Sequence, residues 1–125
     1  MPTIVLVEDN RTICENTSEI LEMEGYTVIT AKNGKEGFQK IKNILPDLII
    51  CDILMPIMNG LDLLTNLGRY PDLKNIPLIF YSAKSEKKDI QHGIDLGAFD
   101  YIVKPSDLSD LLASIRKCLF QGKLS

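Results

Sequence analysis

The chain alternates short apolar runs with longer stretches whose apolar residues recur at helical spacing, and this alternation occurs five times in 125 residues. Each apolar run is of strand length and predicts a buried strand. Buried strands that alternate with helices predict a parallel sheet covered on both faces by right-handed crossovers. We therefore expect a doubly wound α/β fold with strands over residues 3–7, 26–31, 47–51, 77–81 and 98–103.

Residues that start or stop helices lie between these runs. We expect helices over residues 11–24 and 85–96, ended by Gly25 and Gly97, and a turn at residues 33–34. Ser106 is expected to cap the last helix. The inward-facing side chains that we expect are Phe38 and Ile41 in the second helix, Leu63, Leu64 and Leu67 in the third, Ile90 and Ile94 in the fourth, and Leu108, Leu111, Leu112, Ile115 and Leu119 in the last.

Length and composition limit the classes of protein to which the chain can belong. With 45% hydrophobic and 25% charged residues, 125 residues predict a single globular domain with one packed core. No apolar run approaches the roughly 20 residues of a membrane span, and residues 1–3 do not resemble a signal peptide, so we expect a cytoplasmic protein. A net charge of -3 argues against direct nucleic-acid binding. Three widely spaced cysteines without a CxxC pair predict reduced thiols and no zinc site.

Polar residues follow four of the predicted strands at the point where each strand ends. They are Glu8 and Asp9, Asp52, Ser82 and Lys104. Because ligands of doubly wound folds bind at the carboxyl ends of the strands, we expect these five side chains to share one site. Taken singly, such residues are more often helix caps or turn residues. Their joint position at four strand ends predicts a functional site.

Three carboxylates in one place repel each other unless a cation lies among them. Oxygen ligands favour Mg²⁺ or Mn²⁺, and a magnesium ion held by carboxylates is a common arrangement for handling phosphoryl groups. Lys104 adds a positive charge that can offset the negative charge of phosphoryl oxygens. The set predicts phosphoryl transfer assisted by a divalent metal.

Several motifs of the chain resemble those of receiver domains from two-component response regulators, of the chemotaxis-Y type. They are the segments at residues 7–9, 51–56, 59–60, 81–83 and 100–105, which read VED, CDILMP, NG, YSA and DYIVKP. The resemblance covers nearly the whole chain. It implies a flavodoxin-like fold with strand order 2-1-3-4-5, and residues 1–125 as one receiver domain without an output domain.

The same resemblance implies a role for each site residue. Asp52 would accept the phosphoryl group, and Ser82 and Lys104 would contact its oxygens. The metal would be bound by Asp52, by Asp9 directly, by Glu8 mainly through water and by the backbone carbonyl of Leu54. The peptide bond between residues 104 and 105 would be cis.

The resemblance also implies partners and a switch. The phosphoryl group would come from a sensor histidine kinase or a histidine phosphotransfer protein, and the domain would support its own phosphotransfer and autodephosphorylation without being a classical enzyme. Ser82 and Tyr101 would act as the switch. A downstream protein would read the surface formed by the helix over 85–96, the strand over 98–103 and the last helix, and that surface could support a phosphorylation-dependent dimer. Leu54 and Lys84 would flank the mouth of the site and set the lifetime of the phosphorylated form.

Several details depart from the family pattern, and some alternatives stay open. Asn59 stands where Asp is frequent, Glu8 replaces the commoner Asp, and residues 105–108 lack a Pro-Phe pair, which favours a stand-alone or hybrid-kinase receiver. A flavin protein would need a hydroxyl-rich first loop, a haloacid-dehalogenase-type phosphatase would need a carboxylate at Leu54, and a P-loop motif is missing. The remaining alternative is a receiver-like interaction domain that is never phosphorylated. The single histidine, His92, is expected to be a surface residue.

Overall fold

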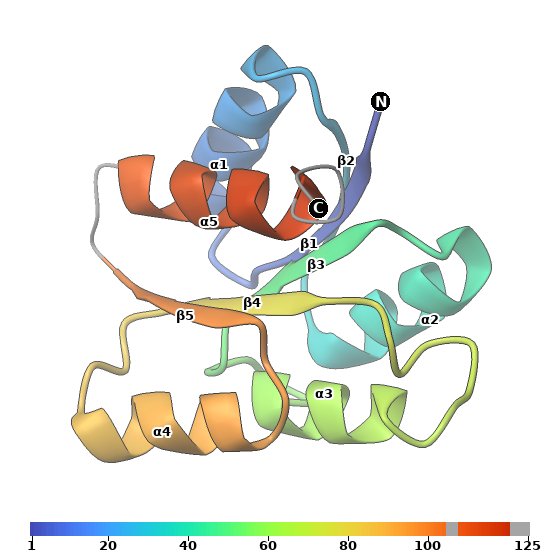
Figure 1. Cartoon of the computed structure of the whole chain (residues 1–125), viewed down its shortest axis with the longest axis vertical. Helices are drawn as coiled ribbons and strands as arrows, with labels where there is room; N and C mark the ends of the chain where they lie inside the picture. Colours follow the sequence, from blue (N-terminus) through green and yellow to red (C-terminus); the bar gives the residue numbers. More distant parts are fainter. Residues whose placement is uncertain (105–107, 121–125) are drawn as a thin grey trace.

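The computed structural model describes residues 1–104 and 108–120 and confirms the expected fold. In this part of the chain, five parallel strands form one sheet in the order β2-β1-β3-β4-β5 (Figure 1). The pairing is in register along the whole central ladder, with Val5 opposite Ile29 on one side and Ile49 on the other. The strands are β1 (Thr3–Val7), β2 (Thr27–Ala31), β3 (Leu48–Cys51), β4 (Leu78–Ser82) and β5 (Asp100–Val103).

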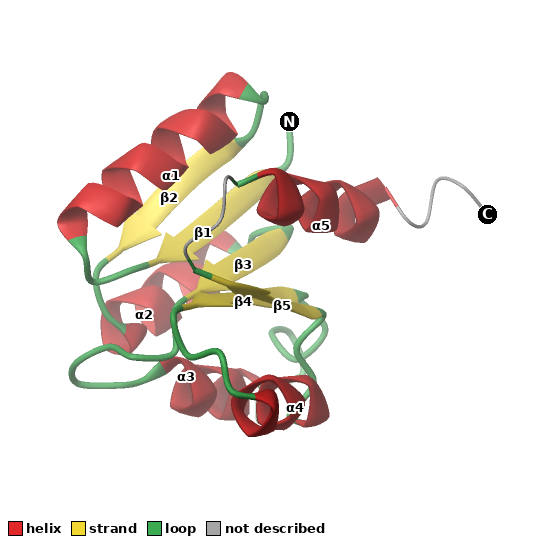
Figure 2. Ribbon diagram, turned by 90° about the vertical axis from the view of Figure 1, so that its left-hand side faces the viewer, coloured by secondary structure: helices red, strands yellow, loops and turns green. Residues whose placement is uncertain are grey.

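One helix follows each strand, and the helices cover both faces of the sheet. Figure 2 shows α1 and α5 on one face and α3 and α4 on the other, with α2 beside α3. Their bounds are α1 (Arg11–Met23), α2 (Gly34–Ile44), α3 (Gly60–Leu67), α4 (Lys87–Asp95) and α5 (Ser109–Phe120). The predicted elements are therefore present, and the ends that were predicted differ from the observed ones by at most two residues.

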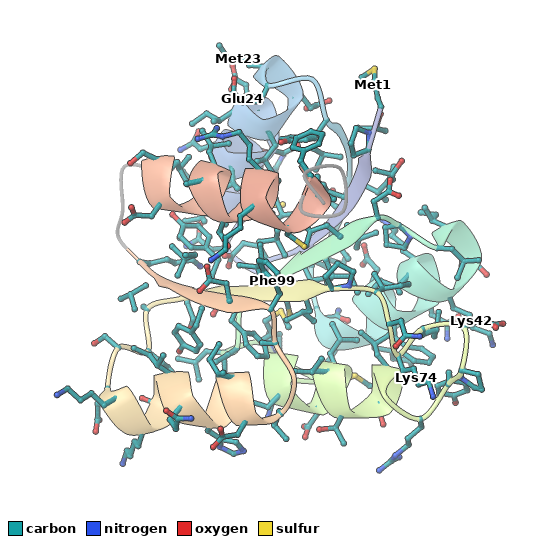
Figure 3. The ribbon with its side chains drawn as sticks, viewed as in Figure 1. Met1, Met23, Glu24, Lys42, Lys74 and Phe99 are labelled. Atoms are coloured by element: carbon teal, nitrogen blue, oxygen red, sulfur yellow. The ribbon has the colours of Figure 1, made fainter. Side chains whose placement is uncertain are left out.

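Two apolar clusters, one on each face of the sheet, hold the layers together, and side chains fill the space between the sheet and the helices (Figure 3). Strand residues contribute to the two clusters alternately, as the pleat requires: Ile4 and Leu6 pack toward α1 and α5, whereas Val5 and Val7 pack toward α2 and α3. Most expected helix residues join these clusters. An exception is Ile94, which is 39% exposed, so its predicted inward position is wrong. Gly93 is the buried residue of α4 instead, because its lack of a side chain lets the helix lie close to the sheet.

Asparagine side chains cap three helices at the edge of the sheet that carries the strand-end residues. The side-chain oxygens of Asn10, Asn33 and Asn59 accept hydrogen bonds from the backbone N–H groups of the first turns of α1, α2 and α3. The chain bends at residues 32–33, where the sequence predicts a turn, and Asn33 also caps α2, of which Gly34 is the first residue. A Cβ atom at Gly34 would overlap the carbonyl oxygen of Met58, which explains the glycine.

Other predictions have mixed outcomes. Positive φ angles at Gly25 and Gly97 agree with their expected places after helices. Cys51 is buried, Cys14 and Cys118 are half-buried, and all three thiols are free. The predicted cap at Ser106 and the predicted cis bond to Pro105 lie outside the described residues. Within the described ranges, none of the helices is both long and apolar enough to span a membrane.

Candidate functional site

Backbone pairing at the strand ends brings the expected site residues to one edge of the sheet. The backbone N–H of Asp52 donates to the carbonyl of Val7 over 3.0 Å, and the N–H of Lys104 donates to the carbonyl of Ser82 over 2.8 Å. These two bonds extend the ladder one residue beyond β3 and β5, and the bond from the N–H of Glu8 to the carbonyl of Ala31 extends it one residue beyond β1. Because the strands are parallel and in register, the site residues lie at one edge of the sheet: β4 ends at Ser82, and the others follow the ends of β1, β3 and β5.

Three carboxylates meet at this edge, on the two central strands β1 and β3. One side-chain oxygen from each of Glu8, Asp9 and Asp52 lies within 4.8 Å of the others. Their surroundings differ: Glu8 is buried, Asp52 is half-buried and Asp9 is exposed. A group of three oxygen donors with one side open to solvent is suited to a hard divalent cation such as Mg²⁺.

Lys104 extends from the end of β5 into this carboxylate group. Its Nζ forms an ion pair with Asp52 Oδ2 at 3.0 Å and a second ion pair with Glu8 Oε1. All three side chains are largely removed from water, with 9% of Lys104, 3% of Glu8 and 11% of Asp52 exposed. The Nζ of Lys104 lies over the ring of Tyr81, 5.2 Å from the centroid of that ring. The lysine is therefore a largely buried, ion-paired cation and not a solvated surface charge.

Burial and pairing shift the proton affinities of these groups. Burial raises the pKa of Glu8, although hydrogen bonds from Lys104 and from the backbone of Asn10 oppose the shift. For Lys104, burial lowers the pKa, but its hydrogen bonds with Glu8 and Asp52 outweigh that effect, so the pKa is raised. The ammonium consequently keeps its charge at neutral pH.

The loop after β3 orients Asp52. The Oδ1 atom of Asp52 accepts hydrogen bonds from the backbone N–H groups of Ile53 at 2.6 Å and Leu54 at 3.3 Å, while Oδ2 faces Lys104. A Cβ atom at Gly60 would overlap the Asp52 carbonyl oxygen, so only glycine lets α3 start so close to the site. Leu54 itself is 58% exposed, at the rim of the site.

Ser82 and Tyr101 lie on the β4–β5 side of the site. Ser82 is fully buried, and its hydroxyl accepts a hydrogen bond from the N–H of Lys84 at 3.3 Å. The Tyr101 ring points to the α4 side of the sheet, as its odd spacing from Lys104 predicts, and packs against Phe80. Its hydroxyl donates to the carbonyl of Lys84 over 2.7 Å. Tyr101 is thereby linked to the loop that begins at Ser82.

Sequence reasoning missed three residues that shape the site. Asn10 contributes its backbone N–H, which donates to Glu8 Oε2 over 3.1 Å. Gly60 and Gly93 allow close approach of α3 and α4, and a Cβ at Gly93 would lie 3.1 Å from both Phe80 and Tyr101. The only sequence signal was glycine at or inside a predicted helix. Gly93 permits tight packing of α4 against these two rings. The expected surface position of His92 is confirmed.

Comparison with known proteins gives the family. The model of the response regulator receiver domain matches residues 4–116. Transcriptional regulatory protein DltR from Streptococcus agalactiae is 41% identical over 121 residues, which are 97% of this chain and 53% of that protein. Response regulator ArlR from Staphylococcus aureus is 38% identical over 119 residues, with 95% and 53% covered. The chain spans about half the length of these relatives.

Solved structures give the same result. The chemotaxis protein CheY4 of Vibrio cholerae superposes with a TM-score of 0.89 at 28% identity, covering 95% of this chain and 99% of that chain. The signal receiver domain of a histidine kinase from Syntrophus aciditrophicus has a TM-score of 0.89 at 35% identity, with 100% and 95% covered. With its flavodoxin-like fold and its match to the family model, the chain belongs to the receiver domains of two-component response regulators.

Proposed function

We propose that the chain accepts a phosphoryl group on Asp52 from a phosphorylated histidine of a sensor kinase or a histidine phosphotransfer protein. The observation that carries this proposal is the meeting of three carboxylates within 4.8 Å of one another, with Lys104 Nζ 3.0 Å from Asp52. Carboxylates this close together repel one another unless cations lie among them. Membership of the receiver family and the histidine kinase relative support the choice of donor.

The transfer step follows from the groups around Asp52. One carboxylate oxygen forms a bond to phosphorus while the bond between phosphorus and the imidazole nitrogen of the donor breaks. The imidazole leaves with the bonding electron pair and can take a proton from solvent. Lys104, already at Asp52, offsets the negative charge of the phosphoryl oxygens, and backbone N–H groups of Ile53 and Leu54 hold the carboxylate in place.

A divalent metal completes this site in the proposal. Asp9 and Asp52 would bind Mg²⁺ or Mn²⁺ directly, Glu8 would bind mainly through water, and the carbonyl of Leu54 would add a further oxygen. The oxygen-only donor set and the exposed position of Asp9 fit such an ion. When bound, it would neutralise charge on the phosphoryl oxygens. Hydrolysis of the aspartyl phosphate at the same site would return the domain to its starting state.

In this proposal, α4, β5 and α5 form the surface that a downstream protein would bind. Ser82 would move toward a phosphoryl oxygen, and Tyr101 would pass the change to α4 through its bond with the carbonyl of Lys84. A downstream protein, or a second copy in a phosphorylation-dependent dimer, would bind there. The relatives DltR and ArlR are named as regulators, in agreement with an output partner outside these residues.

A cytoplasmic location stays a prediction.

Intact-protein mass spectrometry tests the proposal. Incubation with acetyl phosphate and Mg²⁺ should add one phosphoryl group, and a chelator or the Asp52→Asn substitution should prevent the addition. A receiver-like domain that only docks partners would stay unmodified under all conditions. Addition of a phosphoryl group to Asp52→Asn, or equal addition in excess chelator, would contradict the assignment.

A further inference from the structure

The ammonium of Lys104 already lies among the carboxylates to which the proposed function assigns a metal ion. Its Nζ contacts Glu8 Oε1 and lies 3.0 Å from Asp52 Oδ2. Both carboxylates belong to the group of three whose oxygens lie within 4.8 Å of one another. The ammonium and the proposed divalent cation would therefore share the carboxylates of Glu8 and Asp52.

The hydrogen bonds of Glu8 and Asp52 occupy part of the lone-pair positions that an incoming ion would use. Glu8 Oε1 contacts Lys104, and Oε2 accepts from the backbone of Asn10 over 3.1 Å. Asp52 Oδ1 accepts from the N–H groups of Ile53 and Leu54, and Oδ2 accepts from Lys104. Each of these four oxygens thus has a donor. Of the donors, only the side chain of Lys104 can leave without breaking the backbone arrangement.

Glu8 makes this contact possible through the length of its side chain. Its backbone N–H is fixed by the carbonyl of Ala31 at 2.9 Å, so the carboxylate must reach across the sheet edge toward Lys104 from a fixed point. An aspartate in the same place has one methylene fewer and would end short of the ammonium. The contact is also buried, with 3% of Glu8 and 9% of Lys104 exposed, so water does not screen it.

We propose that Lys104, held by Glu8, is an internal counter-ion that competes with the divalent cation and so sets the affinity of the site for metal. The proposal rests on the proposed function, since it concerns the same metal site. In the absence of metal, Lys104 neutralises the buried Glu8 and Asp52. When metal binds, Lys104 leaves Glu8 and keeps its contact with Asp52 alone, where it can meet phosphoryl oxygens. Metal binding thereby also positions the lysine.

Calorimetric titration with Mg²⁺ and NMR of lysine side-chain ¹³Cε signals test this competition. In the unmodified protein, the Lys104 signal should shift as Mg²⁺ saturates the site. Lys104→Gln should bind Mg²⁺ about tenfold or more tightly, because a buried positive charge is removed. Glu8→Asp keeps every charge but loses the reach to Lys104, and it should bind Mg²⁺ a few-fold more tightly. This second variant separates competition for a ligand from general charge repulsion.

Lys88→Gln is the matched control. Lys88 lies on α4, where its Nζ is 3.7 Å from Glu86 and its side chain is 79% exposed. Its substitution should change the Mg²⁺ affinity by less than about twofold, because exposed charges are screened by solvent.

The outcomes separate this inference from the proposed function. If Mg²⁺ binds to the unmodified protein but the Lys104 signal stays in place, or if Lys104→Gln and Glu8→Asp bind no more tightly, the counter-ion role is wrong and the metal site stands. If the unmodified protein binds no Mg²⁺ at millimolar concentration, the proposed function fails together with the inference.

Discussion

Leu54 lies two residues after Asp52, at the rim of the site, and its side chain is 58% exposed. An apolar side chain there offers no hydrogen bond to a water molecule that attacks the aspartyl phosphate. We expect Leu54→Asn to speed the loss of the phosphoryl group by about tenfold, less than the effect of a fully positioned general base. Decay followed by mass spectrometry after removal of acetyl phosphate measures the rate. Ile57→Asn, the same kind of change on the same loop, should leave the rate unchanged, and equal or slower decay in Leu54→Asn would contradict the role of Leu54.

Ile57 has a strained backbone with little burial to offset the strain. Its φ is 71°, and the N–H of Met58 donates to the carbonyl of Pro56 over 2.7 Å, which closes a three-residue turn around it. A β-branched residue rarely adopts this conformation, whereas asparagine tolerates it. Since Ile57 is 77% exposed, Ile57→Asn should raise the free energy of unfolding by about 1 kcal/mol. Urea denaturation measures this change, with Leu54→Asn as a control near zero, and a loss of stability would contradict it.

At the scale of elements, α4 depends on Gly93 for its position. A Cβ atom there would lie 3.1 Å from the rings of Phe80 and Tyr101, closer than ordinary contact. Alanine favours a helix over glycine by about 1 kcal/mol, but overpacking of a core costs about 1–3 kcal/mol. Because the overpacking outweighs the gain in helix propensity, we expect Gly93→Ala to lower the free energy of unfolding by about 1 kcal/mol. Gly68→Ala, where φ is -63° and the nearest atom is 3.4 Å away, should be neutral or stabilising in the same denaturation series. A stabilised Gly93→Ala would show that α4 is loosely packed.

The connection between β4 and α4 is the element that would carry the signal. Ser82 accepts from the N–H of Lys84, and Tyr101 donates to the carbonyl of the same residue, so both proposed switch residues contact Lys84. The Tyr101 ring is already buried, so the proposed switch would act by changing this contact and would need no refolding. To move the two states of this switch from a ratio of 1:99 to 99:1, phosphorylation would have to favour one state by about 5.5 kcal/mol.

Amide NMR with beryllofluoride and Mg²⁺ tests the Ser82–Tyr101 switch. Resonances from Lys84 to Leu96 and those of β5 and α5 should shift, because Ser82 leaves Lys84 for the phosphoryl analogue. Ser82→Ala should shrink these shifts while Mg²⁺ alone still moves the signals of Asp9 and Asp52. Shifts confined to the strand-end loops, or undiminished in Ser82→Ala, would contradict the switch.

At the scale of the molecule, the periodic spacing of apolar residues was enough to predict most of the fold. Five apolar runs fixed the layers and the sheet edge at which Asp52 and Lys104 meet, because parallel strands place all their carboxyl ends together. The apolar pattern of the sequence could not predict contacts that depend on the length of a side chain or on the exact position of a helix. The pairing of Lys104 with Glu8 depends on how far the two side chains reach, and the place of Gly93 on the buried side of α4 depends on how closely the helix approaches two rings. Asn33 shows a further limit, since Asn-Gly is found both in turns and at helix starts.

The central claim is that a phosphoryl group is attached to Asp52 and to no other residue. Borohydride reduction converts an aspartyl phosphate to homoserine, so peptide mass spectrometry after incubation with acetyl phosphate and Mg²⁺ identifies the modified position directly. The account predicts homoserine at position 52 alone, and none after incubation with a chelator. Homoserine at Asp9 or another carboxylate, or an unmodified Asp52 in a protein that has gained a phosphoryl group, would contradict it.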